Sequence, residues 1–348
     1  MKIACLVSGG VDSSTSLYLL QQQGFKPEAF YIKIWMEDDF FDCPWKEDLE
    51  YVKKVTKKLK VKLNVVSMQK EYWDKIIKYT LNEVRIGRTP NPDVFCNTFI
   101  KFGLFYEKYG KDFDKVATGH YARIINDDKA YLAKAKDPSK DQAYFLSQMT
   151  KRQLSRCMFP VGDLLKTEVR KIAKEANLAT HSRPDSQGLC FLGKVNFKQF
   201  LEKYVGIKNG DIIDLDSKQV IGNHQGHWFF TLGQREGLKI GGAGLPYYVA
   251  DKDALKNIVY VVKGQDHKAL WKNKLGISNL NILVSDSLDE TKIYDVQLRY
   301  HSSIIKATIK KQKNNLKLIL QKPYFAVAPG QIGVLYDKDL IVASGIIK

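Results

Sequence analysis

A short segment near the start of the chain has the composition of a phosphate-binding loop. The sequence SGGVDS at residues 8–13 follows the apolar run 3–7 and precedes a stretch of helical character at 14–23. Two adjacent glycines let the backbone turn tightly, so that successive N–H groups and a helix N-terminus point toward one place. This order of strand, turn and helix predicts an anion site formed by Leu6, Val7, Ser8, Gly9, Gly10, Val11, Asp12 and Ser13.

The loop differs from two common nucleotide-binding motifs. A Walker loop ends in Gly-Lys-Ser or Gly-Lys-Thr, and a dinucleotide fingerprint reads G-x-G-x-x-G, whereas SGGVDS contains neither. It resembles the pyrophosphate loop of ATP pyrophosphatases, which split ATP into AMP and pyrophosphate and use the AMP to activate an oxygen of a second substrate. An ordinary glycine turn before a helix is the alternative interpretation.

Two cysteines in loops could carry sulfur chemistry. Cys96 follows the proline-rich segment 87–93, which we expect not to be helical, and it precedes a helix that carries Lys101. A helix N-terminus and nearby cations lower the pKa of a thiol, and Asp93 could handle a proton or orient a base. Cys190 ends the sequence PDSQGLC. Many cysteines are only small buried apolar residues, but two of them in loops of one nucleotide-binding domain indicate paired sulfur chemistry.

Alternating strands and helices must position these residues. Strand-like runs at 3–7, 29–35 and 61–66 alternate with helical patterns at 14–23 and 47–59. This order predicts a parallel, doubly wound α/β sheet, in which strand ends form the ligand crevice. There we expect Ile32 to contact the adenine and Gly119 and His120 to end a strand, although His120 alone is more typical of a structural residue. Further along, Asp163 and Thr167 suit the capping of a helix around 166–176.

The pattern of the sequence changes after residue 200, from alternating strands and helices to short strands. Short strand-like runs broken by glycine predict a small, mostly β central domain, and the short strands after about residue 275 predict a β-barrel or sandwich. We therefore expect a catalytic domain at 1–200, a central domain at 201–272 and a C-terminal domain at 273–348. Residues 301–322 hold six lysines and no acidic residue. Their alternation along a strand could track a phosphate backbone, or it could protect a solvated sheet edge.

Composition limits the class of protein. The chain has 348 residues, 44% hydrophobic content and a net charge of +17, which favours a polyanionic partner such as nucleic acid. A general lysine enrichment of the proteome would produce the same charge. The five cysteines are scattered, without a C-x-x-C pair, so neither a zinc site nor a secreted disulfide framework is indicated. Met1 lies just before the first strand and no apolar run could span a bilayer, so we expect a cytoplasmic protein without membrane contact.

Taken together, the motifs resemble the tRNA-specific 2-thiouridylases, which place sulfur on the wobble uridine of tRNA. The matching blocks extend from residue 3 to residue 340: SGGVDSS, GRTPNPDVFCNTFIKF, ATGHYAR, KDQAYFLS, DSQGLCFL, FTLGQREGL, LRY and APGQIGVLYD. Two departures are present. Gly188 stands where the family commonly has an acidic residue, and residues 33–35 read Lys-Ile-Trp where Lys-Asn-Trp is usual. The resemblance implies an adenine nucleotide alpha hydrolase-like catalytic domain followed by a mostly β central domain and a C-terminal β-barrel.

The resemblance also implies a mechanism. ATP, accompanied by Mg²⁺, would adenylate the O2 oxygen of the uracil, with Asp12 as the one suggested ligand of the metal. Cys190 resembles the persulfide carrier, which an upstream sulfur-donor protein loads. Cys96 resembles the nucleophile and resolving thiol, and would end in a disulfide with Cys190. Asp93 belongs to the loop that meets the flipped target base.

The family contacts the anticodon stem-loop of tRNA through several blocks. The resemblance assigns RNA contacts to Asn91, Pro92, Asp93, His120, Lys140, Asp141, Gln142, Arg299, Tyr300 and Gln331. A single active site in each chain leads us to expect a monomer. Two other functions remain open: a different pyrophosphate-loop enzyme, which would not need two loop cysteines, and a non-catalytic RNA-binding protein, which would not need the glycine loop.

Overall fold

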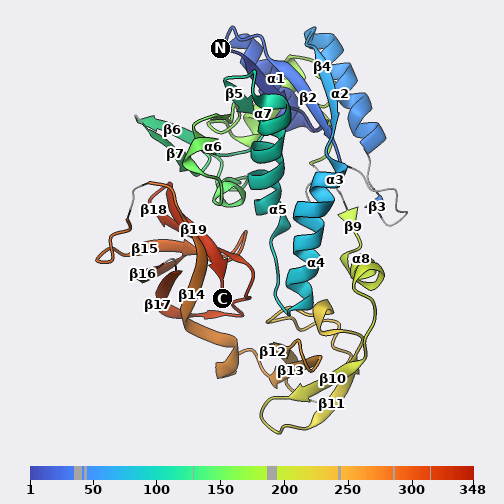
Figure 1. Cartoon of the computed structure of the whole chain (residues 1–348), viewed down its shortest axis with the longest axis vertical. Helices are drawn as coiled ribbons and strands as arrows, with labels where there is room; N and C mark the ends of the chain where they lie inside the picture. The colour runs from blue at the N-terminus through green and yellow to red at the C-terminus, as the bar shows by residue number, and fades with distance from the viewer. Residues whose placement is uncertain are drawn as a thin grey trace.

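The protein consists of three parts that follow one another along the chain. The computed structural model describes residues 1–34, 41–42, 45–127, 129–185, 194–241, 244–284, 287–313 and 315–348. A parallel sheet with helices lies at one end, a small β-domain at the other, and a β-barrel to one side (Figure 1). The predicted order of an α/β domain, a mostly β domain and a β-barrel is confirmed. Within the described ranges, no helix is long and apolar enough to cross a membrane.

The first sheet has a central strand from which the chain winds in both directions. Its order is β4 (Leu63–Ser67), β2 (Glu28–Lys33), β1 (Ile3–Leu6), β5 (Lys115–Ala117) and β8 (Cys157–Met158), and every pairing is parallel. The chain moves outward from β1 to β4 and then returns to β5 on the other side of β1. The strand order therefore reverses between β1 and β5, the place where doubly wound sheets bind ligands.

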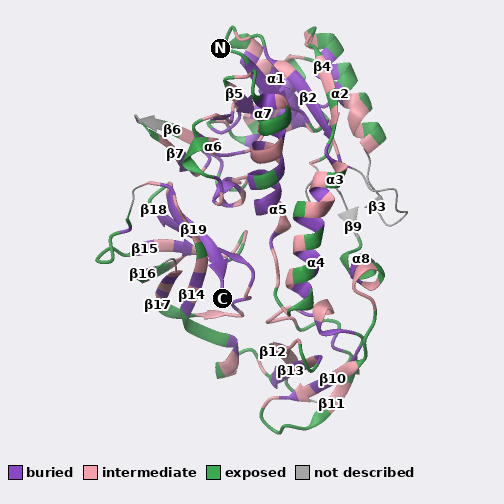
Figure 2. Cartoon of the chain, viewed as in Figure 1, coloured by how far each residue is buried: buried purple, intermediate pink, exposed green. Residues whose placement is uncertain are grey.

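Helices bury the apolar strands of this sheet. Helices α1 (Val11–Gln22), α2 (Trp45–Leu59) and α7 (Lys166–Glu175) pack around it, and the strands beneath them are largely buried (Figure 2). Cys5 lies in the core cluster shared by β1, α1 and α2, and burial raises the pKa of its thiol to about 12. Cys5 is therefore a core residue that stays protonated at neutral pH.

A long helical layer leads away from the sheet to the central domain (Figure 1). It comprises α3 (Gln69–Tyr72), α4 (Lys78–Arg85) and α5 (Pro92–Phe95), with π-helical segments at Trp73–Ile77 and Cys96–Leu104. The expectation that residues 87–93 are not helical is wrong for its last two residues, because α5 begins at Pro92. Proline is tolerated at the first helical position, where its missing N–H would have no partner in the helix.

The central domain is a four-stranded sheet attached to the end of α4. After α8 (Phe197–Tyr204), the sheet order is β11, β10, β13, β12, with bounds Val220–His224, Gly210–Asp214, Ile258–Lys263 and Tyr247–Asp253. His227 connects the central domain to the first domain. Its Nδ1 lies 3.1 Å from Asn257 Oδ1, and its Nε2 lies 3.1 Å from the carbonyl oxygen of Arg85.

Lys252 in this domain makes stability depend on pH. Its ammonium donates to the carbonyl of Phe230 at 2.8 Å, and burial lowers its pKa to about 8, although Asp251 opposes this shift. Between about pH 8 and pH 10 this lysine is therefore protonated more in the unfolded chain than in the folded protein. The free energy of unfolding consequently rises with pH across this window. We expect the melting temperature of the wild type, relative to that of Lys252→Met, to rise from pH 8 to pH 10. The exposed Lys256→Met should show no such trend relative to wild type, and equal trends in both variants would contradict this assignment.

The C-terminal domain is a closed barrel. Its strands follow the order β14, β17, β16, β15, β18, β19, and β19 pairs back with β14; their bounds are Trp271–Ile282, Asn315–Phe325, Ile305–Gln312, Tyr294–Gln297, Ile332–Asp337 and Leu340–Ile347. The predicted alternation is present in β16, where Lys306 and Lys310 are exposed and Ala307 and Ile309 are buried. Because β16 pairs with β15 at Ile305–Ala307 and with β17 from Ala307 on, the alternative of a lysine-protected sheet edge is wrong for Lys306; at Lys310, which is paired with β17 only, both interpretations stay open.

Short elements join the domains. The hairpin of β6 and β7 extends from the first domain to the barrel, where Ala133 pairs with Leu340 of β19. Two further short strands, β3 and β9, pair with each other. The bounds of these elements and of the remaining short helix α6 are Arg123–Asp127 for β6, Lys129–Ala133 for β7, Phe41–Asp42 for β3, Lys194–Val195 for β9 and Lys151–Leu154 for α6.

Candidate functional site

The glycine loop lies at the switch point of the sheet, between the end of β1 and the start of α1. The backbone N–H of Ser8 donates to Ser13 Oγ at 3.1 Å, and the hydroxyl of Ser14 donates to the carbonyl of Gly10 at 2.9 Å. Gly10 is the N-cap of α1 and provides no side-chain cap for it. The first N–H groups of α1 therefore point out of a closed turn, as an anion site requires.

Two close approaches explain why glycine is needed here. Gly9 has φ +81°, and a Cβ on it would lie 2.6 Å from the carbonyl oxygen of Asp48. A Cβ on Gly119, just after β5, would lie 2.5 Å from the backbone nitrogen of Ser13. The strand ends of β1 and β5 thus meet at the loop. The predicted ligand residues Ser13 and Gly119 come together, whereas Ile32 is buried in the core beside Leu6, and its contact with adenine stays a prediction.

An ion-pair network next to the loop was missed by the sequence reasoning. Lys166 Nζ lies 2.7 and 2.8 Å from the two carboxylate oxygens of Asp12 and 2.8 Å from Asp185 Oδ1. Tyr121 donates its hydroxyl to Asp12 at 2.7 Å, and Lys140 and Arg170 contact Asp185 at 2.8 and 2.6 Å. Burial alone would raise the pKa of Asp185, but hydrogen bonds from Lys140 and Lys166 outweigh it and lower the pKa to about 2.

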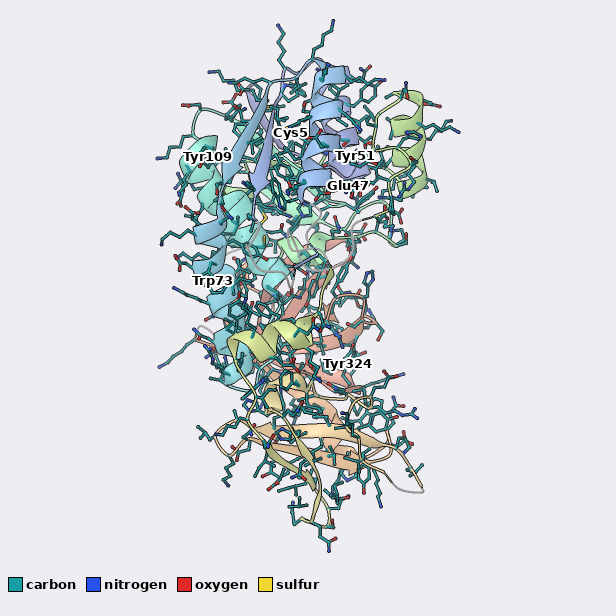
Figure 3. All side chains as sticks on the ribbon, turned by 90° about the vertical axis from the view of Figure 1, so that its right-hand side faces the viewer. Cys5, Glu47, Tyr51, Trp73, Tyr109 and Tyr324 are labelled. Atoms are coloured by element: carbon teal, nitrogen blue, oxygen red, sulfur yellow. The ribbon has the colours of Figure 1, made fainter. Side chains whose placement is uncertain are left out.

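Arg183 clamps the loop from the side of α2. Its Nη1 donates to the carbonyl of Gly9 at 2.8 Å, and its Nη2 lies 2.6 Å from Asp48 Oδ1. The guanidinium also stacks on Tyr51 at 4.5 Å, on the face of α2 that carries Glu47 and Tyr51 (Figure 3). Burial raises the pKa of Asp48 although Arg183 opposes it. The backbone of the loop is therefore fixed before any ligand binds.

The start of α7 differs from the expected capping. Neither Asp163 nor Thr167 is the N-cap, because the helix begins at Lys166 after Leu165. Glu168 Oε2 accepts the N–H of Leu165 at 2.6 Å, and Asp137 Oδ2 accepts the N–H of Lys166 at 2.9 Å. A lysine in the first turn opposes the helix dipole. That unfavourable placement was the signal in the sequence that Lys166 has partners elsewhere.

Cys96 lies inside the protein, four residues after the start of α5. It has no exposed surface and belongs to the main core cluster with Val94, Phe95 and Ile100. The N-cap of its helix is Asn91, whose Oδ1 accepts the N–H of Val94 at 3.4 Å. The predicted helix N-terminus is therefore one turn before the thiol. Because Cys96 has no exposed surface, a reaction at its thiol requires the residues that cover it to move. Cys190 lies outside the described residues.

His120 connects the helix of Cys96 to the end of β5. Its Nδ1 lies 2.8 Å from Thr118 Oγ1, and Lys101 Nζ lies 3.5 Å from its Nε2. Because an ammonium group only donates, Nε2 accepts and Nδ1 carries the proton. Burial, followed by the charge of Lys101, lowers the pKa of His120 well below its ordinary value. The imidazole is neutral and serves as a hydrogen-bonding link; a contact with RNA stays a prediction.

Several of the residues predicted to bind RNA gather around Tyr144. Its hydroxyl donates to the carbonyl of Ile332 at 2.9 Å; burial raises its pKa, while a hydrogen bond with Asn91 and the charge of Arg299 act in the opposite direction. The ring of Tyr300 packs 4.1 Å from that of Phe145. Burial and then the charges of two carboxylates, Asp141 and Asp93, raise the pKa of Tyr300. Three sequence blocks therefore meet where α5 faces the barrel.

The remaining predicted RNA residues make contacts within the protein. Gln331 Nε2 donates to the carbonyl oxygens of Thr89 and Pro90 at 2.9 and 3.3 Å and is buried beneath the loop before half-buried Pro92. Asp141 accepts the N–H of Ala135, and Gln142 accepts that of Tyr121. Lys140 pairs with Asp185, as described above. Each of these side chains supports a loop of the site, and their contacts with RNA stay predictions.

Comparison with known proteins covers the whole chain. Three family models match in succession: the tRNA methyl transferase HUP domain at residues 1–194, the tRNA methyl transferase PRC-barrel domain at 198–263, and the aminomethyltransferase beta-barrel domain at 272–347. The tRNA-specific 2-thiouridylase of Parabacteroides distasonis is 42% identical over 100% of this chain and 99% of its own length. The chain belongs to the tRNA-specific 2-thiouridylase family.

Other thiouridylases show the same relation. Those of Porphyromonas gingivalis and Bacteroides thetaiotaomicron are 42% and 41% identical, over 100% and 99% of this chain and 99% and 98% of their own lengths. The resemblance drawn from the sequence blocks is thereby confirmed for the thiouridylase family as a whole. The roles of single residues rest on the geometry described above.

Proposed function

We propose that this protein uses ATP to replace the O2 oxygen of a wobble uridine in tRNA by sulfur. The observation that carries the proposal is a continuous link between the glycine loop and the helix of Cys96. Gly119 packs on Ser13 of the loop, its neighbour His120 contacts Lys101, and Lys101 lies in the π-helical segment that begins at Cys96. A chain of contacts thus connects the loop that we propose to bind phosphate with the helix that carries the thiol.

The residues fit ATP as the activating substrate. A helix N-terminus in a glycine turn, flanked by Lys166, favours an anionic group. ATP bound there would transfer its AMP group to O2 of the uracil and release pyrophosphate, which makes O2 a good leaving group. Mg²⁺ is expected with the ATP; Asp12 has the carboxylate oxygens that this ion prefers, and because both of them accept hydrogen bonds from Lys166 here, Asp12 would bind the ion only after Lys166 turns away from it. Gly9 and Gly119 let Asp48 of α2 and the end of β5 pack directly against the loop, which holds its backbone in place.

The sulfur step assigns the two cysteines different roles. The outer sulfur of a persulfide on Cys190 would attack C2, and AMP would leave with the former O2. Cys96 would then attack the inner sulfur, which leaves the outer sulfur on C2 and forms a disulfide between Cys96 and Cys190. In the alternative order, Cys96 attacks the inner sulfur first, and the hydrosulfide that is released attacks C2 and displaces AMP. A two-electron reductant reopens that disulfide, and a sulfur-donor protein renews the persulfide.

The grouping of residues around Tyr144 supports tRNA as the second substrate. Asn91, Asp93, Arg299 and Tyr300 come from both the first domain and the barrel, so one ligand could contact both. The lysines of β16 would attract its phosphates. We place the protein in the cytoplasm and expect it to act as a monomer.

Methyl transfer is a second candidate, because two of the matching families are tRNA methyl transferase domains. The usual biological methyl donor presents a sulfonium cation at its reacting centre, whereas this loop presents N–H donors and a lysine, which favour phosphates. An enzyme that adenylates a different oxygen is also compatible with the loop, but it gives no role to Cys96. We therefore favour thiolation.

One experiment separates these functions. The protein is incubated with unmodified tRNA, ATP, Mg²⁺, a persulfide sulfur donor and a thiol reductant, and pyrophosphate release and the mass of the uridine are measured. We expect tRNA-dependent pyrophosphate release and a gain of about 16 Da on one uridine per tRNA, because sulfur replaces oxygen. Pyrophosphate without a sulfur product would indicate a different adenylating enzyme. Absence of both would contradict the proposal.

A further inference from the structure

Lys166 is a buried cation in an unfavourable position. It is 8% exposed and is the first residue of α7, where the positive end of the helix dipole repels its charge. Asp137 accepts the backbone N–H of Lys166 at 2.9 Å, and this hydrogen bond fixes the start of the helix. A buried ammonium group is costly unless its partners compensate for lost hydration. The partners of Lys166 therefore indicate which function its charge serves at this position.

These partners lie on two separate segments beside the glycine loop. Asp12 belongs to the loop, and Asp185 lies just after Arg183, which binds the carbonyl of Gly9. Among the described residues of this cluster, the three cations Lys140, Lys166 and Arg170 face the carboxylates of Asp12 and Asp185. The carboxylate of Asp137, which accepts the backbone N–H of Lys166, brings the cluster to three cations and three carboxylates, so Lys166 can turn toward an added anion without leaving a net negative charge behind.

The loop itself contains no cation. A Walker loop includes a lysine that reaches the phosphates, whereas SGGVDS supplies only backbone N–H groups and hydroxyls. Hydrogen bonds between a charged side chain and a phosphate are stronger than those between neutral groups, so a site without a cation binds phosphate more weakly. A loop of this kind therefore needs a cation from another element. Lys166 Nζ already contacts both carboxylate oxygens of Asp12, a residue of the loop.

We propose that Lys166 is the residue that supplies this charge to the phosphates of ATP, and that Asp12 and Asp185 hold its ammonium group ready when ATP is absent. This inference rests on the proposed use of ATP. Lys166 on α7 then performs for this loop the task that a Walker lysine performs from within its own sequence.

Lys166→Gln tests the proposal with binding measurements in the absence of turnover. We expect the dissociation constants of ATP and of inorganic pyrophosphate, measured by calorimetry, to rise about tenfold or more, because a charge-assisted contact is lost. The affinity for uncharged adenosine, measured by NMR, and the affinity for tRNA should be unchanged. Lys166→Arg should recover part of the pyrophosphate binding. Lys171→Gln, on an exposed position of the same helix, should bind all ligands as the wild type does.

Asp185→Asn separates a phosphate ligand from a structural ion pair and is also informative if Lys166→Gln does not fold. It removes one negative charge and frees Lys166 from one partner, so pyrophosphate should bind a few times more tightly. If Lys166 only holds the segments together, pyrophosphate binding weakens in both variants, and the proposal is wrong. Unchanged pyrophosphate affinity in Lys166→Gln would overturn it as well. Both of these results concern only the role of Lys166. The proposed function is refuted by a different result, namely the absence of thiolation by the wild-type protein.

Discussion

Replacing Cys96 by serine is expected to abolish sulfur transfer to tRNA while leaving tRNA binding nearly intact. A serine hydroxyl is not ionised at neutral pH and forms no persulfide or disulfide, so neither assigned role of the thiol survives. The buried position of Cys96 also limits the effect on binding, because the side chain has no exposed surface for the RNA to contact in this conformation. Thiolation is measured by the mass of the target uridine, and binding by a filter or fluorescence assay. Cys190→Ser is expected to give the same loss.

Cys157→Ser provides the matched control. Cys157 is buried in β8 of the same domain, and its thiol donates to the carbonyl of Gln153 at 3.1 Å, a contact that serine preserves. Burial raises the pKa of Cys157 well above its ordinary value, which makes it inert. We expect this variant to thiolate tRNA as the wild type does. Retained thiolation in Cys96→Ser or Cys190→Ser would show that the role assigned to that cysteine is wrong.

The sequence predicted best where a local pattern has one physical solution. The glycine loop between a strand and a helix fixed both the local geometry and the position at the switch point, because a parallel sheet brings the ends of β1 and β5 together. The alternation in β16 likewise determined which face carries the lysines. Pro92 was misread, since the same residue that ends a helix also starts one, and only the cap at Asn91 distinguishes the two cases.

The charged network beside the loop could not be predicted in this way. Lys166 is separated from Asp12 by 154 positions, and its place in the first turn of a helix shows only that it needs partners. Asp137 replaces the local cap that Asp163 or Thr167 would have provided. Such contacts depend on how helices cross the sheet, which no local pattern contains. The glycine loop therefore reveals the ligand class, whereas the fold supplies the charges that the ligand needs.

Gly119→Ala is expected to eliminate ATP-dependent pyrophosphate release. A Cβ at this position would lie 2.5 Å from the nitrogen of Ser13 and 2.7 Å from the carbonyl carbon of Asp12, which are backbone atoms that cannot rotate away. The start of α1 would have to move away from β5, and the N–H groups of the loop would move with it. Because a misplacement of about 1 Å can cost a hundredfold in rate, we expect a loss of at least that size.

Gly241→Ala distinguishes this effect from a general intolerance of alanine. Among the described residues, its chain neighbours apart, no heavy atom lies within 4 Å of a Cβ built there, so the rate of this variant should equal that of the wild type. Pyrophosphate release is measured with saturating tRNA, and calorimetry with ATP shows whether binding is lost as well. Weaker ATP binding with unchanged melting temperature would locate the defect in the loop. Wild-type pyrophosphate release by Gly119→Ala would mean that the loop does not need this contact with β5, and that the phosphates bind elsewhere on the sheet.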